Sequence, residues 1–124
     1  MKIIDSNGWL EFFTDGPLSE PYSAEIATDP GEILVPTIVL YEVYKFLLRT
    51  SSEETAIRCT AHMTQCRVVD LDSVMALESA ETSVRSKLAM ADAIVYATSR
   101  KYNARLITSD IDLKGLEGVT YLEK

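Results

Sequence analysis

Short apolar runs alternate along the chain with longer segments in which apolar residues recur every three or four positions. Short runs bounded by turn residues are typical of buried strands, and the longer periodic segments are typical of amphipathic helices. We predict strands at 2–5, 32–35, 67–71, 105–108 and 118–122. We predict helices at 9–13, 18–28, 37–50, 52–66, 73–87 and 90–100. This alternation indicates a parallel α/β sheet with right-handed crossovers.

Turn and capping residues mark the ends of these elements. Residues 6–8 (Ser-Asn-Gly) predict a turn between the first strand and the first helix. Ser52 is followed by two acids, and either Asp72 or Ser73 precedes an apolar repeat, as at a helix N-terminus. The helix at 37–50 has apolar residues on nearly every side, so we expect it to be largely buried.

Four acidic residues lie near one predicted edge of the sheet. Asp5 follows the first strand, Asp110 follows the fourth, and Asp92 opens the helix that precedes the fourth strand. Glu42 lies inside an apolar helix, where a carboxylate is rarely buried without a partner, and Lys45 is its nearest counter-charge. Because parallel strands bring their carboxyl ends to one edge, we expect the four acids to share a pocket.

Each of these acids alone also fits an ordinary role, as a turn residue, a helix cap or a surface ion pair. Together they form a set of repelling carboxylates that a cation would neutralise. Oxygen ligands without thiols or paired histidines select hard divalent ions, Mg²⁺ or Mn²⁺. Such ions can activate water for attack on a phosphodiester, which is nuclease chemistry. The single histidine, His62, lies in another predicted helix, and we expect a structural or surface role for it.

The composition narrows the class of protein. With 124 residues, 47% of them hydrophobic, we expect a single folded domain over residues 1–124. No apolar run is long enough to cross a bilayer, and residues 1–5 lack the apolar core of a signal peptide, so we expect a cytoplasmic protein without a membrane partner. Cys59 and Cys66 lie seven residues apart in one predicted helix, too far for a disulfide.

The charge of the chain is negative and uneven. A formal net charge of -7 argues against a generic nucleic-acid binder. Residues 1–34 carry seven acids and one lysine, whereas residues 85–105 carry five bases and one acid. This basic segment is a candidate for contact with a phosphate backbone, although a solvated helix face is the commoner origin of such a cluster. The candidate substrate-binding residues are Arg85, Lys87 and Arg100.

Four segments of the chain, in this order and spacing, resemble the PIN-domain ribonucleases, especially the toxin half of VapBC toxin-antitoxin pairs. They are residues 4–7 (IDSN), 40–42 (LYE), 91–98 (ADAIVYAT) and 106–113 (LITSDIDL). The resemblance spans nearly the whole chain. Leu113 stands where many relatives carry phenylalanine, which we expect to affect packing more than chemistry.

The resemblance implies a PIN-like three-layer sandwich, a five-stranded parallel sheet of order 3-2-1-4-5 flanked by helices. It implies endonucleolytic cleavage of RNA, Mg²⁺ or Mn²⁺ as cofactor, a homodimer, and a cognate antitoxin whose C-terminal segment occupies the active-site groove. The residues that it implies are Asp5, Glu42, Asp92 and Asp110 as catalytic and metal-binding acids, Asp112 as a further metal-binding acid, and Ser6 and Thr108 as supporting hydroxyls.

Two other interpretations compete with this one. In a receiver-type phosphoacceptor domain Asp70 would accept the phosphoryl group and Thr108 would supply the hydroxyl. That interpretation leaves Glu42 and Asp92 unexplained, and almost no chain follows the last strand to form a closing helix. A noncatalytic PIN-like module that only binds a partner would have no use for a concentration of repelling carboxylates.

Overall fold

The computed structural model describes residues 1–124 and contains one five-stranded sheet in which all neighbouring strands are parallel. The strands are β1 (Lys2–Ile4), β2 (Ile33–Pro36), β3 (Arg67–Val69), β4 (Arg105–Thr108) and β5 (Val119–Tyr121). Their order across the sheet is β3-β2-β1-β4-β5, which confirms the predicted order. The predicted strands are confirmed, with small differences at their ends.

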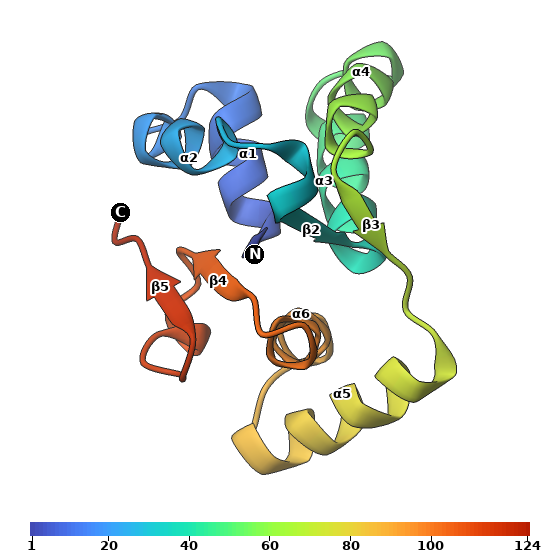
Figure 1. The fold of residues 1–124 in the computed structure, drawn as a ribbon. Helices are drawn as coiled ribbons and strands as arrows, with labels where there is room; N and C mark the ends of the chain where they lie inside the picture. The colour runs from blue at the N-terminus through green and yellow to red at the C-terminus, as the bar shows by residue number, and fades with distance from the viewer.

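Helices cover both faces of the sheet and make three layers (Figure 1). In this view α1, α2, α3 and α4 lie on one side of the sheet, and α5 and α6 lie on the other. The helices are α1 (Ser6–Thr14), α2 (Ser19–Ile26), α3 (Thr37–Thr50), α4 (Glu53–Met63), α5 (Ser73–Ser86) and α6 (Met90–Lys101), with short 3₁₀ turns η1 (Pro30–Glu32) and η2 (Ile111–Leu113). Ser52 caps α4 and Asp72 caps α5, each by accepting a backbone hydrogen bond.

The parallel register brings the ends of the central strands together. Ile3 of β1 pairs with Leu34 of β2 on one side and with Leu106 of β4 on the other. The amide of Asp5 continues this ladder by donating to the carbonyl of Ile107 at 3.0 Å. The residue that follows β1 therefore lies beside the end of β4.

Helix α6 packs most deeply of all the helices. Every residue from Ala93 to Ser99 is buried, although the sequence pattern is not strongly apolar. Its alanines carry little side-chain volume, so the helix backbone can lie close to its neighbours. Close packing thus explains the alanine-rich composition of residues 91–97, and it fixes the position of Asp92 in the first turn of α6.

Helix α3 differs from the expectation of a largely buried helix. It buries Val39, Val43 and Leu47 along one face, whereas Tyr41 is 56% exposed and Lys45 is exposed. The helix packs against α1 and α4 and also contacts α6 and β2, whereas the side that carries Tyr41 and Lys45 faces solvent. Its apolar residues off the buried face are therefore only partly covered.

The turn predicted at residues 6–8 is wrong, because α1 begins at Ser6. Asp5 caps this helix by accepting a hydrogen bond from the amide of Ser6. Gly8 is buried within the helix, where a Cβ would lie 2.7 Å from Cγ2 of Ile4 and would overlap the ring of Tyr22. The close approach of α1 to β1 and α2 explains the glycine. The turn predicted from the sequence did not account for this packing.

We expect Gly8→Ala to lower the free energy of unfolding by about 2–3 kcal/mol, because the added methyl group must displace packed side chains. Chemical denaturation followed by circular dichroism measures this change. Gly31→Ala is the matched control, since its Cβ would meet only Asp29 Oδ1 at 3.4 Å, and its effect should stay within roughly 0.5 kcal/mol. Equal stability of the two variants would contradict the close-packing explanation.

Two smaller expectations from the sequence are also tested. Cys59 and Cys66 are both free thiols, although Cys66 lies beyond the end of α4 and the two do not share one helix as predicted. None of the helices has the length and apolar character needed to cross a membrane.

Candidate metal centre

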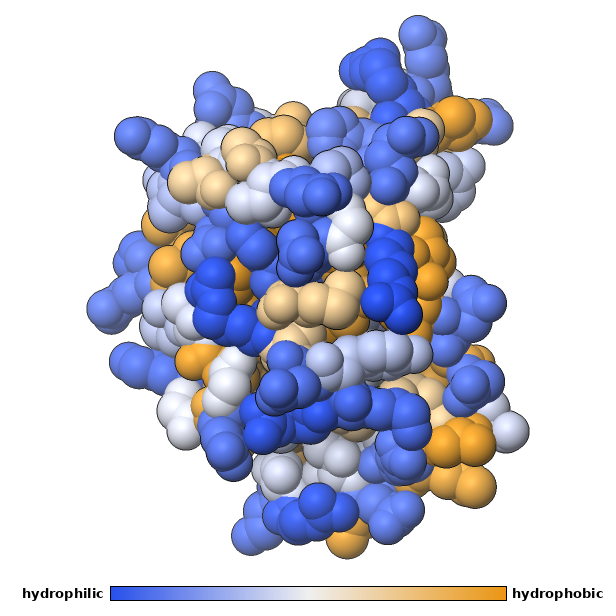
Figure 2. Space-filling model, viewed as in Figure 1, coloured by the Kyte–Doolittle hydropathy of each residue, from blue (hydrophilic) through white to orange (hydrophobic).

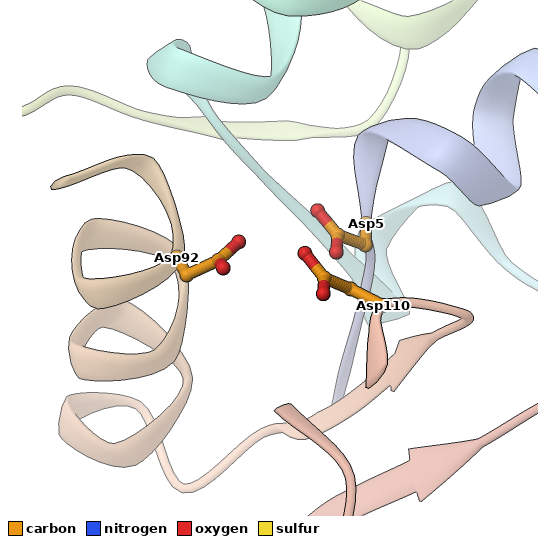
Figure 3. Close-up of side chains that lie close together, drawn as sticks. All are labelled: Asp5, Asp92 and Asp110. Atoms are coloured by element: carbon orange, nitrogen blue, oxygen red, sulfur yellow. The ribbon is translucent and has the colours of Figure 1, made fainter. Parts of the chain in front are cut away.

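Three aspartates from three separate elements meet at the carboxyl edge of the sheet (Figure 3). Asp5 follows β1, Asp92 lies in the first turn of α6, and Asp110 follows β4. Each offers a carboxylate oxygen, and these three oxygens lie within 4.8 Å of one another. In Figure 3 the three side chains point toward one another from the surrounding elements. The predicted convergence of these three acids is therefore present.

Asp5 is held firmly by its neighbours. It is 5% exposed, and its two carboxylate oxygens accept hydrogen bonds from the amide of Ser6 at 2.8 Å and from the hydroxyl of Thr108 at 2.7 Å. The hydroxyl of Thr108, itself fully buried, accepts from the amide of Asp110 at 3.0 Å. Thr108 thus links the first and last aspartates of the cluster and fixes their relative positions.

The other two aspartates are placed by the ends of helices. Asp110 caps η2, where its side chain accepts from the amide of Asp112 at 2.9 Å. Asp92 occupies the first turn of α6, whose N-cap residue Ala89 offers no side-chain hydrogen bond. Unpaired amides at a helix N-terminus favour a negative charge. Backbone amides at the starts of η2 and α6 therefore favour the two carboxylates at these positions near the sheet edge.

Burial and the charge of neighbouring carboxylates raise the pKa of two of these side chains, Asp92 and Asp5. The pKa of Asp92 is raised to about 7, chiefly by burial and then by the neighbouring Asp110 and Asp5. Burial is also the main cause that raises the pKa of Asp5, against the opposing effect of its hydrogen bonds from Thr108 and Ser6. No lysine or arginine forms an ion pair with any of the three. The cluster is an uncompensated concentration of negative charge.

Glu42 lies near this cluster but outside the group of three. Its carboxyl group is half-buried, and its pKa is raised first by burial and then by the charges of Asp5 and Asp110. The Ser6 side chain acts in the opposite direction and lowers it. Lys45, the counter-charge considered from the sequence, forms no ion pair with Glu42. The charges that raise the pKa of Glu42 are therefore those of Asp5 and Asp110.

The donor set fits a hard divalent cation. All the side chains that converge are carboxylates, and no cysteine or histidine joins them. Such oxygen ligands suit Mg²⁺ or Mn²⁺, which would also relieve the repulsion that raises the carboxyl pKa values. Asp112 is exposed and contributes to the raised pKa of Asp92, so it lies at the rim of the same charge cluster.

The basic residues proposed from the sequence lie elsewhere. Arg85 and Arg100 line a cavity of about 500 Å³ between α5 and α6, together with Glu78 and Glu81. Arg100 forms an ion pair with Glu117 at 3.5 Å. Much of the positive charge of this cavity is therefore matched by acids.

Three remaining residues singled out in the sequence are exposed. Lys87 ends α5 in a left-handed conformation. His62 is exposed on α4 and lies against the rings of Trp9 and Phe13, which agrees with the expected structural role. Asp70 follows β3, an edge strand that β2 separates from β1, so it does not join the aspartate cluster as a receiver-type pocket requires.

A polar network behind the cluster was not predicted from the sequence. The hydroxyl of Tyr22 lies 2.7 Å from Oγ of Ser109 and donates to Oδ1 of Asn7 at 3.3 Å. Oδ1 of Asn7 also accepts from the amide of Ser109 at 3.3 Å. This network ties α2 to the segments that carry Asp5 and Asp110. Tyr22 lies in the helix predicted at 18–28 from its apolar repeat, and such a repeat gives no signal for a hydroxyl group.

Comparisons with known proteins add to this geometry. A family model described as the PIN domain matches residues 2–119. A sequence search of the curated proteins finds no match.

Several solved structures share the fold. A toxin-antitoxin complex from Klebsiella pneumoniae contains a chain with a TM-score of 0.84 and 21% identity, covering 100% of both chains. VapC20 of Mycobacterium tuberculosis, a toxin that cleaves the sarcin-ricin loop, gives 0.75 and 17%, covering 92% of each chain. VapBC2 of Rickettsia felis, bound to a DNA fragment from its promoter, gives 0.75 and 15%, covering 98% of this chain and 97% of that one. The TM-scores establish a common fold, and at identities this low the comparison establishes the fold alone.

Proposed function

Because this chain belongs to the PIN domain family, we propose that it is a divalent-metal-dependent endoribonuclease, the toxin of a type II toxin-antitoxin pair. The observation that carries the proposal is the convergence of Asp5, Asp92 and Asp110 within 4.8 Å at the carboxyl edge of the sheet. A binding module gains nothing from uncompensated carboxylates, whereas a metal-dependent hydrolase requires them.

In this proposal Asp5, Asp92 and Asp110 hold Mg²⁺ or Mn²⁺, with Glu42 and Asp112 completing the acidic set. The bound ion would supply positive charge at the scissile phosphate and a water activated for in-line attack. The chain's own contribution is to hold the carboxylates in position. Thr108 does this by donating to Oδ2 of Asp5 while it accepts from the amide of Asp110.

Ser6 has two roles in the proposed site. Its amide donates to Oδ1 of Asp5, so both oxygens of that carboxylate are oriented. Its side chain lies beside Glu42 and favours the charged form of that group. Ser6 and Thr108 are thus the supporting hydroxyl residues of the proposal, one on each side of Asp5.

The test of this proposal is a cleavage assay with the purified chain, freed of any co-purified partner. Labelled single-stranded and structured RNAs are incubated with Mg²⁺, with Mn²⁺ and with EDTA. We expect cleavage that depends on the metal and stops with EDTA. Calorimetry with the metal alone distinguishes a narrow RNA specificity from the noncatalytic module, because the latter would bind no metal. In cells, an RNA substrate would place this activity in the cytoplasm.

An antitoxin partner and a homodimer are further parts of the proposal. Structures with the same fold include toxin-antitoxin complexes from Klebsiella pneumoniae and Rickettsia felis. For the homodimer, the support is the apolar outer face of α5. Leu77 is 69% exposed, Val84 is 82% exposed, and the neighbouring Met90 is 72% exposed. Figure 2 shows apolar surface gathered at the lower right, in the region of α5.

We expect Leu77→Glu combined with Val84→Glu to convert the protein to a monomer in light scattering after size exclusion. The two residues lie seven apart on one side of α5, and burying carboxylates between two copies would weaken association by roughly a hundredfold or more. Ile57→Glu on α4, where the side chain is 52% exposed, is the control and should leave the mass unchanged. A wild-type protein that is already monomeric would remove the homodimer from the proposal.

A further inference from the structure

A second cavity, of about 290 Å³, adjoins the metal centre on the side of α3. It shares Ser6 and Glu42 with the acidic site, and its wall continues along α3 through Tyr41, Lys45 and Arg49. We call it the α3 groove. The groove begins at the carboxylates and leads away from them along a helix, so a chain-like ligand could extend from the site into it.

The charged residues of the groove form one stripe along α3. Glu42, Lys45 and Arg49 are spaced three and four residues apart, which places them on the same side of the helix. With a rise of about 1.5 Å per residue, Lys45 and Arg49 lie roughly 4.5 Å and 10.5 Å from Glu42 along the helix axis. Two positive charges therefore follow the acidic site at increasing distance in a single direction.

Both cations of the stripe are available for a ligand. Lys45 and Arg49 are exposed and form no ion pair. Aromatic rings support them instead: the Lys45 ammonium lies 5.6 Å from the ring centroid of Tyr41, and the Arg49 guanidinium lies 5.7 Å from that of Phe46. By contrast, Arg100 already pairs with Glu117.

Tyr41 adds an aromatic surface to the groove. Tyr41 is 56% exposed, and it lines the groove beside Glu42, one helical turn before Lys45. Proteins that bind single-stranded nucleic acid combine a basic track for the phosphates with aromatic rings on which bases stack. An acidic peptide would neutralise the two cations but would not stack on the ring of Tyr41 as a nucleic-acid base does.

We propose that the α3 groove binds the backbone of single-stranded RNA next to the cleavage site. Lys45 and Arg49 contact the two phosphates that follow the scissile one, and Tyr41 stacks on the base next to the scissile phosphate. This inference rests on the proposed ribonuclease function. It explains how a chain of net charge -7 approaches RNA, because the positive charge is placed where the strand enters the site.

The first experiment measures RNA binding as a function of salt. In an Asp92→Asn background, which holds the RNA uncut, a labelled 12-nucleotide RNA of mixed sequence is titrated across KCl concentrations. We expect Lys45→Ala combined with Arg49→Ala to weaken binding roughly tenfold at low salt, and to reduce the slope of log K against log salt by about 1.4 for two lost phosphate contacts. Alanine is a strong helix former, so α3 is retained.

A charge-matched control separates contact from net charge. Arg58→Ala combined with Arg67→Ala removes two exposed cations from α4 and the amino end of β3, away from the groove, and should leave the salt slope unchanged. For the aromatic ring, Tyr41→Ala should weaken binding roughly tenfold, whereas Tyr41→Phe should not, because it keeps the stacking surface. In the active protein we expect the groove variant to raise KM with little change in kcat.

The outcomes distinguish the groove from the function it rests on. If wild-type protein cleaves RNA but the groove variant binds with an unchanged salt slope, the groove assignment is overturned and the nuclease stands. If only Arg85→Ala combined with Lys87→Ala reduces the slope, the strand follows α5 instead. If the groove variant loses affinity for poly-glutamate and keeps affinity for RNA, the groove serves an acidic protein segment. If wild-type protein neither binds nor cleaves any RNA, both proposals fail.

Discussion

Replacing Asp92 with asparagine is expected to reduce RNA cleavage by on the order of a thousandfold or more, while leaving the metal-free protein at least as stable as the wild type. The loss follows because Asp92 is one of three side chains that would hold the ion, and the ion supplies several kcal/mol of stabilisation to the transition state. An amide of nearly the same shape keeps the packing but removes the negative charge. The variant therefore isolates the charge from the fold.

The stability part of this prediction separates a functional carboxylate from a structural one. Asp92 forms no ion pair, and its neighbours Asp110 and Asp5 repel its charged form. Removing the charge thus relieves an unfavourable interaction in the folded state. If Asp92 were needed only to hold the fold, Asp92→Asn would instead lower the midpoint of thermal unfolding. We expect Asp5→Asn to behave in the same way.

The control for both measurements is Asp70→Asn. Asp70 is an exposed acid that follows edge strand β3, outside the aspartate cluster. This substitution makes the same change of charge and shape, and we expect it to leave cleavage and unfolding unchanged. Cleavage by Asp92→Asn at the wild-type rate would remove this residue from the catalytic set, whatever its effect on stability.

The fold could be predicted from the sequence because local signals and tertiary packing agree along most of the chain. Residues 33–36 are a short apolar run that is buried on both faces, and Pro36 ends the strand where α3 begins. Asp72 precedes a helical repeat and caps α5 through the amide of Met75. In each case one element is specified by residues within its own length.

The errors arose where a residue is explained by a distant neighbour. Gly8 follows Ser6 and Asn7 like a turn residue, but contact with Ile4 and Tyr22 requires a glycine inside α1. The same limitation hid the hydroxyl of Tyr22, because its partners Asn7 and Ser109 are remote in sequence. Contacts between residues that are remote in sequence leave no periodic pattern in the sequence, so they could not be predicted from it.

The candidate site was predictable to a similar extent. The carboxyl-edge rule places Asp5 and Asp110 together from strand positions alone, and Asp92 follows from the helix that precedes β4. The rule does not predict how deeply the carboxyl group of Glu42 is buried, because that burial depends on which elements pack against α3. The sequence also did not predict that Lys45 forms no ion pair, since an ion pair with Glu42 was compatible with their spacing.

Ion pairs within the fold partly explain the many acids of residues 1–34. Glu25 forms ion pairs with Lys2 at 3.0 Å and with Arg105 at 2.9 Å, and these partners, Arg105 first, hold its pKa below the usual range. Glu11 pairs with Lys124 at 3.6 Å. Some of the acids in residues 1–34 therefore serve the fold, and the uncompensated charge that remains at the sheet edge is the charge of the candidate metal centre.

The metal-free protein is expected to lose stability as the pH rises from about 5.5 to about 8, and added Mg²⁺ is expected to restore it at the higher pH. The pKa of Asp92 is raised to about 7, while in the unfolded chain an aspartate titrates near its ordinary pKa of 3.8. The folded state therefore binds more protons than the unfolded state between these two values. Stability then falls with increasing pH across that window, and the raised pKa values of Asp5 and Glu42 act in the same direction.

The size of this effect is limited because Asp92 remains partly accessible to water, which screens its repulsion. We expect the midpoint of thermal unfolding to fall by roughly 4–8 °C between these pH values, with about 4 °C for each kcal/mol in a chain of this size. Mg²⁺ at a hundred times its dissociation constant would add about 2.7 kcal/mol at pH 8. At pH 5.5 it would add much less, since protons compete for the same oxygens.

Scanning calorimetry with EDTA and with Mg²⁺ at both pH values measures all four states. Asp92→Asn is the informative control, because it removes a carboxyl group whose pKa is raised to about 7 and should flatten the decline of the metal-free protein. It should also reduce the gain from Mg²⁺ at pH 8. A wild-type protein that is equally stable at both pH values and indifferent to Mg²⁺ would mean that the three carboxylates are relieved by something other than a divalent cation, and the proposed hydrolysis would lose its cofactor.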